Sequence, residues 1–174
     1  RKIPVTDVSK CEDPGYQLNQ QGVGNFGMAF VSNSANDACD QIYGNTYSGN
    51  GPFAEGNKIG DFITIEPVNL QLSLLGKTNF DGAEVTGTGD GRAFIFGGSN
   101  PSKLVELDKS DGSVVNLLPL GTLEINNGAF AFAFFAGDFY LFTDSNNDFT
   151  NSEVTLLDYD DSDNNGKQDI KQIV

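Results

Sequence analysis

Apolar and polar residues alternate with a period of two along most of this chain, and no window of helical length carries a clean 3.6-residue apolar stripe. Such alternation is typical of β-strands with one buried face, and β-branched and aromatic residues are enriched in the same stretches. The pattern therefore predicts an all-β chain with almost no helix.

The predicted strands recur in three similar units. Each unit has a first strand, a second strand rich in aromatic residues, a third strand that ends in an acid, and a fourth strand. The acids, Glu66, Asp108 and Asp158, are 42 and then 50 residues apart. Repeats of about 40 to 50 residues with four strands each are typical of propeller blades. We therefore expect a propeller-like array of three four-stranded antiparallel blades, with a β-sandwich as the alternative.

The repeat boundaries divide the chain into an arm and one domain. A chain of 174 residues buries one ordinary core, so a single domain is expected. The repeats are residues 27–75, 83–120 and 129–174 of a domain that spans 27–174. Residues 1–26 are expected to form an irregular N-terminal arm.

Aromatic residues are expected to fill the space between blades. In AFAFAFF, alternation places Phe130, Phe132 and Phe134 on one face of a strand, and Ala129, Ala131 and Ala133 on the other. Large rings would fill one gap between sheets, and small alanines would allow close approach on the other side. The side chains of Phe94, Phe132 and Tyr140 are predicted to be buried between sheets.

Two stretches resemble a known family. The run TGTGDGRAFIFGG, followed by LVELDKSDGSVVNLLPL, resembles the blade repeats of secreted β-propeller proteins. The final loop, DSDNNGKQD, resembles the D-x-D-x-[DN]-G-x-x-D calcium loop of FG-GAP propellers, the repeat type of integrin α subunits. The resemblance implies a secreted or cell-surface propeller with a bound calcium ion. Only the third unit carries the loop, whereas the family usually carries it in several blades.

The chemistry of the same loop also favours calcium. A hard divalent cation takes six to eight oxygen ligands, and alternate side chains of a tight turn converge where a glycine, here Gly166, permits the bend. The predicted ligands are the side chains of Asp161, Asp163, Asn165 and Asp169, and the backbone carbonyl of Lys167. The alternative is a polar hairpin without an ion. An EF-hand is disfavoured, because its flanks would be helices and Gln172 stands where its bidentate Glu is required.

Two further motifs carry less weight. The stretch TDSNNDFTNSE offers Asp144, Asn146, Asp148 and Glu153 but lacks a glycine at the bend, so it is interpreted as a surface loop. The segment GVGNFG matches the dinucleotide fingerprint letter for letter. That fingerprint requires a preceding strand and a following helix, which the sequence does not predict, so the match is interpreted as accidental.

Net charge and cysteine content suggest the environment. The net charge of −14 disfavours nucleic acid and anionic membrane surfaces as partners. An acid excess is usually no more than a solvated surface, although it also suits soluble extracellular surfaces and divalent cations. No apolar run approaches the roughly 20 residues of a membrane span. Cys11 and Cys39 are the only cysteines, and the chain has no histidine, so a zinc site is excluded and a disulfide is predicted. Two free thiols are the alternative.

No reaction is indicated by the sequence. Without histidine the usual Ser and Cys hydrolase triads cannot form, and no catalytic or cofactor-binding residue is predicted. We therefore expect an extracellular or cell-surface binding or scaffold module, with calcium as a structural ion and a protein or glycan surface as its partner. The main alternative is a structural subunit whose copies pair through edge strands. A glycan-active enzyme using two carboxylates is the third alternative.

Overall fold

The three sequence units fold into three separate sheets, each built from four consecutive strands. The computed structural model describes residues 3–37, 39–47, 59–97, 102–121, 123, 130–144, 152–161, 164, 166 and 168–173. The first sheet contains β1 (Asn25–Ser32), β2 (Asp40–Tyr47), β3 (Gly60–Ile65) and β4 (Leu72–Thr78). The second contains β5 (Glu84–Gly87), β6 (Ala93–Gly97), β7 (Lys103–Leu107) and β8 (Val114–Pro119). The third contains β9 (Phe130–Phe135), β10 (Asp138–Thr143), β11 (Glu153–Leu157) and β12 (Ile170–Gln172).

Strand order in each sheet follows the chain, and neighbouring strands are antiparallel. The prediction of an all-β chain with three four-stranded antiparallel sheets is confirmed. The one helical element in the described ranges is a 3-10 turn, η1 (Gln20–Gly22). Nowhere in the described ranges is there a helix long and apolar enough to cross a membrane.

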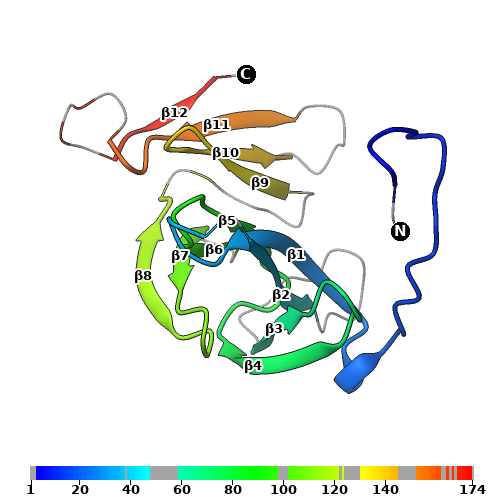
Figure 1. Ribbon diagram of the computed structural model, residues 1–174. Coiled ribbons are helices and arrows are strands. Elements are labelled where there is room, and N and C mark those ends of the chain that lie inside the picture. The colour runs from blue at the N-terminus through cyan, green and yellow to red at the C-terminus, as the bar shows by residue number, and fades with distance from the viewer. Residues whose placement is uncertain are drawn as a thin grey trace.

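The second sheet lies between the first and the third (Figure 1). The first strands of the three sheets, β1, β5 and β9, are neighbours in space. We call the side of a sheet that faces its successor along the chain the forward face, and the opposite side the rear face. The forward face of the first sheet packs on the rear face of the second, and the forward face of the second packs on the rear face of the third.

Strand β6 shows why the second sheet must lie in the middle. All five of its residues, AFIFG, are buried, so neither face can be left in water. Ala93 and Ile95 pack toward the first sheet, whereas Phe94 and Phe96 pack toward the third. A continuous apolar run is typical of a strand covered on both faces.

Aromatic rings fill the gap between the second and third sheets. The Phe94 and Phe139 rings meet edge to face with centroids 4.8 Å apart, and Phe96 lies 5.6 Å from Phe132. Such ring pairs add about 0.5 to 1.5 kcal/mol each to the burial of their apolar area. The predicted placement of Phe130, Phe132 and Phe134 on the core side of one strand is confirmed, although Phe130 and Phe134 are only partly buried.

Small residues let β1 and β5 approach closely. A Cβ atom on Gly87 of β5 would lie 2.7 Å from the Val31 Cα of β1. A Cβ atom on Gly27 of β1 would lie 2.8 Å from the Glu84 Oε2 of β5. A side chain at Gly87 would therefore force the two sheets apart, whereas one at Gly27 would first displace the Glu84 side chain.

The N-terminal arm caps the rear face of the first sheet. Tyr16 and Val23 pack against the apolar rear face formed by Ile42, Ile63, Ile65 and Leu72. The Gln20 side chain donates to the Leu70 carbonyl at 2.9 Å and accepts from the Leu72 N–H at 3.0 Å. One end of the stack is therefore partly covered by the chain itself.

Two expectations differ from the structure. Tyr140 is only partly buried, and its neighbour Phe139 occupies the core instead. The sequence DFYLFT carries an aromatic residue on both of its alternating faces, so alternation alone could not choose between them. The structure pairs Phe139 with Phe134 and Leu141 with Phe132, which turns Tyr140 to the opposite face.

The predicted disulfide is not formed in the structure, where Cys11 and Cys39 are both free and exposed. Cys11 lies on the arm, which reaches the first sheet near Asn25. Cys39 lies at the β1–β2 turn, next to the Ser32–Asp40 pair at the other end of this hairpin.

Because Phe139 is buried and Tyr140 is only partly buried, replacing each by alanine is expected to lower the free energy of unfolding by different amounts. Phe139→Ala is expected to lower the free energy of unfolding by about 3 to 5 kcal/mol, because it empties a fully buried site. Tyr140→Ala is expected to cost about 1 kcal/mol or less, as for other partly exposed positions. Urea denaturation of both variants measures these costs. Equal costs would contradict the assigned faces.

Glu84 predicts a pH dependence. Burial raises the pKa of this carboxyl group above its ordinary value. The ionised form therefore destabilises the folded state, and this cost is absent at low pH and grows as pH rises through the folded pKa. Glu84→Gln is expected to raise the melting temperature at neutral pH, and to raise it less near pH 4. A larger gain at the acidic pH would contradict this account.

Candidate functional site

The predicted calcium loop joins β11 to β12 at one end of the third sheet. At its base, the Asp158 N–H donates to the Asp169 carbonyl at 2.9 Å, which extends the pairing of the two strands. The loop therefore begins and ends at adjacent points of an antiparallel pair. This arrangement brings the two ends of the predicted ligand sequence close together.

The loop turns sharply around Asp161. Asp161, Asn164 and Gly166 have positive φ angles of 54°, 57° and 81°, in the region that favours glycine and tolerates Asp and Asn. The Gly166 N–H donates to both carboxylate oxygens of Asp161 at 3.0 Å, and the Asn164 N–H donates to the Asp161 carbonyl at 3.0 Å. The Asp161 carboxylate is therefore held toward the inside of the turn, where Gly166 was predicted to permit the bend.

Two of the five predicted ligands fall within the described residues. Asp161 is partly buried and Asp169 is exposed. Asp163, Asn165 and Lys167 lie outside the described residues. In the described part of the chain, no group of three or more acidic or cysteine side chains is placed to hold a metal ion. The complete ligand set therefore stays a prediction.

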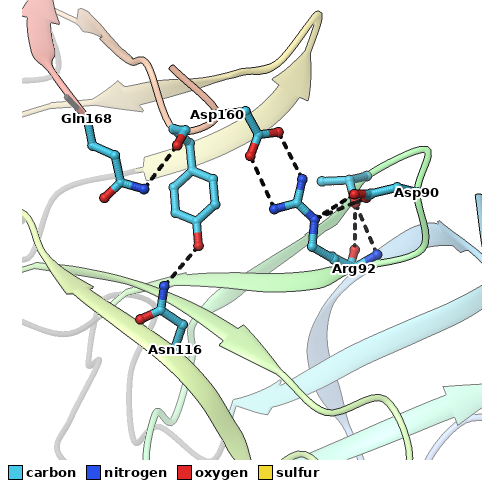
Figure 2. A network of polar contacts seen from close by, with 7 residues as sticks. Asp90, Arg92, Asn116, Asp160 and Gln168 are labelled. Atoms are coloured by element: carbon cyan, nitrogen blue, oxygen red, sulfur yellow. Dashed lines mark hydrogen bonds and ion pairs between the residues drawn. The ribbon is translucent and has the colours of Figure 1, made fainter. Parts of the chain in front are cut away.

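An arginine fastens this loop to the second sheet (Figure 2). The Arg92 guanidinium donates to both carboxylate oxygens of Asp160, at 3.3 and 2.9 Å. The Arg92 Nε also donates to Asp90, at 3.1 and 2.9 Å to its two oxygens. Such bidentate contacts with carboxylates suit the planar guanidinium group and fix its orientation. Arg92 thus joins the turn before β6 to the start of the loop.

Tyr159 makes a second connection between the loop and the second sheet. Its ring is buried and meets the Phe94 ring edge to face at 5.3 Å. Its hydroxyl accepts a hydrogen bond from the Asn116 side chain of β8 at 3.1 Å, and its carbonyl accepts one from the Gln168 side chain at 3.0 Å (Figure 2). The two ends of the loop are therefore linked to each other and to the second sheet.

The hydrogen bonds among Arg92, Asp90 and Asp160 favour the charged forms of these side chains. Burial acts to lower the pKa of Arg92, but hydrogen bonds to Asp160 and Asp90 outweigh it and raise the pKa. Burial acts to raise the pKa of Asp90, but hydrogen bonds from Thr88 and Arg92 outweigh it and lower the pKa. Both groups are therefore ionised at neutral pH. The contact of Arg92 with Asp160 joins residues far apart in sequence, and no sequence pattern had indicated it.

A groove lies on the forward face of the first sheet, remote in the chain from the predicted calcium loop. It has a volume of about 500 Å³ and is lined by side chains of β2, β3, β4 and the β3–β4 turn. Tyr43 and Leu75 provide its apolar surface, and Gln41, Asn69 and Gln71 provide amide groups. Lys109 also lines it, with its ammonium group bound to the Ser32 and Asn33 carbonyls at 2.9 and 2.8 Å. The sequence did not indicate this groove, because its residues come together only when the first sheet folds and Lys109 reaches it from the second unit.

The two weaker motifs are placed as follows. The glycine-rich segment Gly22–Gly27 begins at the last residue of the turn η1 and runs into strand β1, so it lacks the strand–helix context of a dinucleotide site. The strand β1 that follows it agrees with the prediction that no helix begins there. In the second acidic stretch, Asp144 is buried and Glu153 begins β11, whereas Asn146 and Asp148 lie outside the described residues.

The comparisons with known proteins add no relative. No family model, curated protein or solved structure matches the chain. The likeness of the last loop to FG-GAP calcium loops therefore stays an expectation from its residues.

The ion pair between Arg92 and Asp160 is expected to stabilise the protein measurably. A double-mutant cycle with Arg92→Met and Asp160→Asn should give a coupling energy of about 1 kcal/mol, near the upper end for partly exposed pairs. The Lys77–Asp61 pair is the control, because the Lys77 side chain is 66% exposed. Its cycle should give a coupling close to zero. If the two couplings are equal, Arg92 does not fasten the loop as described.

Proposed function

We propose that this protein is a secreted or cell-surface β-propeller-like module that binds or scaffolds other molecules and is stabilised by calcium. The observation that carries the proposal is the stack of three four-stranded sheets, whose first strands are neighbours and whose last loop is fastened to the preceding sheet. Neighbouring first strands with later strands running outward are the arrangement of propeller blades. A sandwich would instead distribute the strands of these units between two sheets.

Calcium is proposed for the loop of residues 158–169. Asp161, Asp163, Asn165, Asp169 and the Lys167 carbonyl would hold the ion. The Asp161 carboxylate is already oriented by Gly166, which reduces the ordering that binding requires. A bound ion would neutralise carboxylates that otherwise repel one another in a chain of net charge −14.

The groove is proposed to take part in binding. Its amides and the Tyr43 ring suit a polar ligand surface, such as a glycan or a protein loop. Glu66 is the single carboxylate among its described lining residues, and it accepts the N–H groups of Val68 and Asn69. Glycoside hydrolysis generally needs two carboxylates, so the groove favours binding over a glycan-active enzyme.

One observation favours the structural-subunit alternative. Strand β8 is an edge of the second sheet, and it exposes Val114, Val115 and Leu117. An edge strand with exposed apolar residues can pair with a strand of another chain. Edge pairing between copies would give an extracellular assembly. The extracellular location itself is proposed from the acidic composition and the loop, since the disulfide is not formed in the structure.

Calcium is expected to raise the melting temperature. At free calcium about a hundredfold above Kd, binding to the folded state alone adds about 2.7 kcal/mol. For a chain of this size that corresponds to roughly 5 to 10 °C. Asp161→Ala and Asp163→Ala should each abolish the increase. Magnesium should give a smaller increase, because it requires stricter octahedral geometry. Differential scanning calorimetry with calcium, magnesium and chelator measures these differences.

Glu12→Ala is the matched control for the calcium experiment. Glu12 is an exposed acid on the N-terminal arm, so its removal changes the net charge equally but leaves the loop intact. The control should keep the full calcium response. A melting temperature that does not respond to calcium or chelator would refute the calcium proposal. An equal loss of response in the control would show general charge screening instead of a site.

A further inference from the structure

The two ends of the three-sheet stack are covered differently. At one end, the arm residues Tyr16 and Val23 pack on the rear face of the first sheet. At the other end, the forward face of the third sheet has no described segment packed on it. This face is formed by Ala131, Ala133, Phe135, Tyr140, Phe142, Val154 and Leu156, with Asp138 and Lys171 at its margin. Phe135 is 70% exposed, Phe142 is 42% exposed, and both alanines are exposed.

The uncovered face has two covered counterparts in the same molecule. Cross-strand triplets mark the equivalent positions: Ala29–Tyr43–Thr64 in the first sheet, Thr86–Phe94–Glu106 in the second, and Ala133–Tyr140–Leu156 in the third. In each, a small residue of the first strand lies beside an aromatic residue of the second. The first two triplets are on faces that the next sheet covers. The repeat therefore indicates that another sheet packs on the third face.

We propose that this other sheet belongs to a second copy of the chain, and that two third sheets pack forward face to forward face in a twofold dimer. A twofold contact uses the same patch on both copies. Here β9 presents a row of small alanines beside the larger side chains of β10 and β11. One face therefore offers both the groove and the ridge that a self-complementary contact needs.

Charge and size also suit this partner. The face carries one acid, Asp138, and one base, Lys171, so its formal charges cancel, and two copies can meet there although each has a net charge of −14. Four strands of three to six residues, spaced about 4.8 Å apart, give a face of at most roughly 20 Å on a side. A contact of that size is smaller than a standard interface, so the dimer should dissociate on dilution.

The proposal names a partner for the scaffolding role proposed above, and it depends on the stacked sheets but not on calcium. Sedimentation equilibrium of the whole chain over a wide concentration range is expected to show a reversible transition between 18.6 kDa and twice that mass. Added salt should strengthen the dimer, because it screens the repulsion between two acidic copies. A monomer at every concentration would overturn the proposal and leave the calcium and groove predictions standing.

Substitutions locate the contact. Phe142→Asp and Ala133→Glu are each expected to weaken the dimer more than tenfold, because the twofold places every substituted residue in the contact twice. Both positions are at least partly exposed, and circular dichroism checks that the variants remain folded.

Two control substitutions separate this contact from other arrangements. Phe30→Asp alters the rear face of the first sheet, where Phe30 is 59% exposed, and Val115→Asp alters the edge strand β8. Both should leave the dimer unchanged. If Phe30→Asp weakens the dimer, the copies pack head to tail. If Val115→Asp weakens it, they pair through edge strands. Either result would overturn the proposed twofold.

Discussion

The burial of both faces of the second sheet is the constraint on which the rest of the structure depends. β6 has no polar side chain to present to water, so it can be stable only with a sheet on either side. Ala93 and Ile95 require the first sheet, whereas Phe94 and Phe96 require the third. Burying four such side chains contributes several kcal/mol, a large share of the net stability of an ordinary domain. Both functional regions proposed above follow from this packing.

The groove and the predicted calcium loop lie at different junctions of the stack. The groove forms where Lys109, after β7, reaches the Ser32 and Asn33 carbonyls of the first sheet. The loop lies where Arg92, before β6, reaches Asp160 of the third unit. In both cases a cation from a turn of the second sheet contacts oxygen atoms of a neighbouring unit. The second sheet therefore fixes the position of both sites.

The sequence predicted the three four-stranded sheets because the patterns that define strands and turns are local in the chain. Alternation and turn residues define each strand, and the recurrence of Glu66, Asp108 and Asp158 defines the units. Alternation could not decide between Phe139 and Tyr140, because both faces of their strand carry apolar or aromatic residues.

The structural features that the sequence did not predict depend on contacts between segments that are distant in the chain. The capping of the first sheet by Tyr16, the pairing of Arg92 with Asp160, and the groove all need the tertiary arrangement, which no local pattern contains. The structure does not show the predicted disulfide, and the elimination of other chemistry that favoured it says nothing about distance. For the candidate site, the bend at Gly166 and the orientation of Asp161 agree with the sequence prediction. The remaining ligands are still defined by sequence alone.

The most direct test of the account is a crystal structure of the protein grown in calcium. The account predicts three separate four-stranded sheets, with the Phe94 and Phe139 rings in contact. It also predicts one calcium ion between Asp161 and Asp169, with the loop held to Arg92 through Asp160. Strands of the second and third units merged into one continuous sheet, or a loop without an ion at saturating calcium, would contradict it.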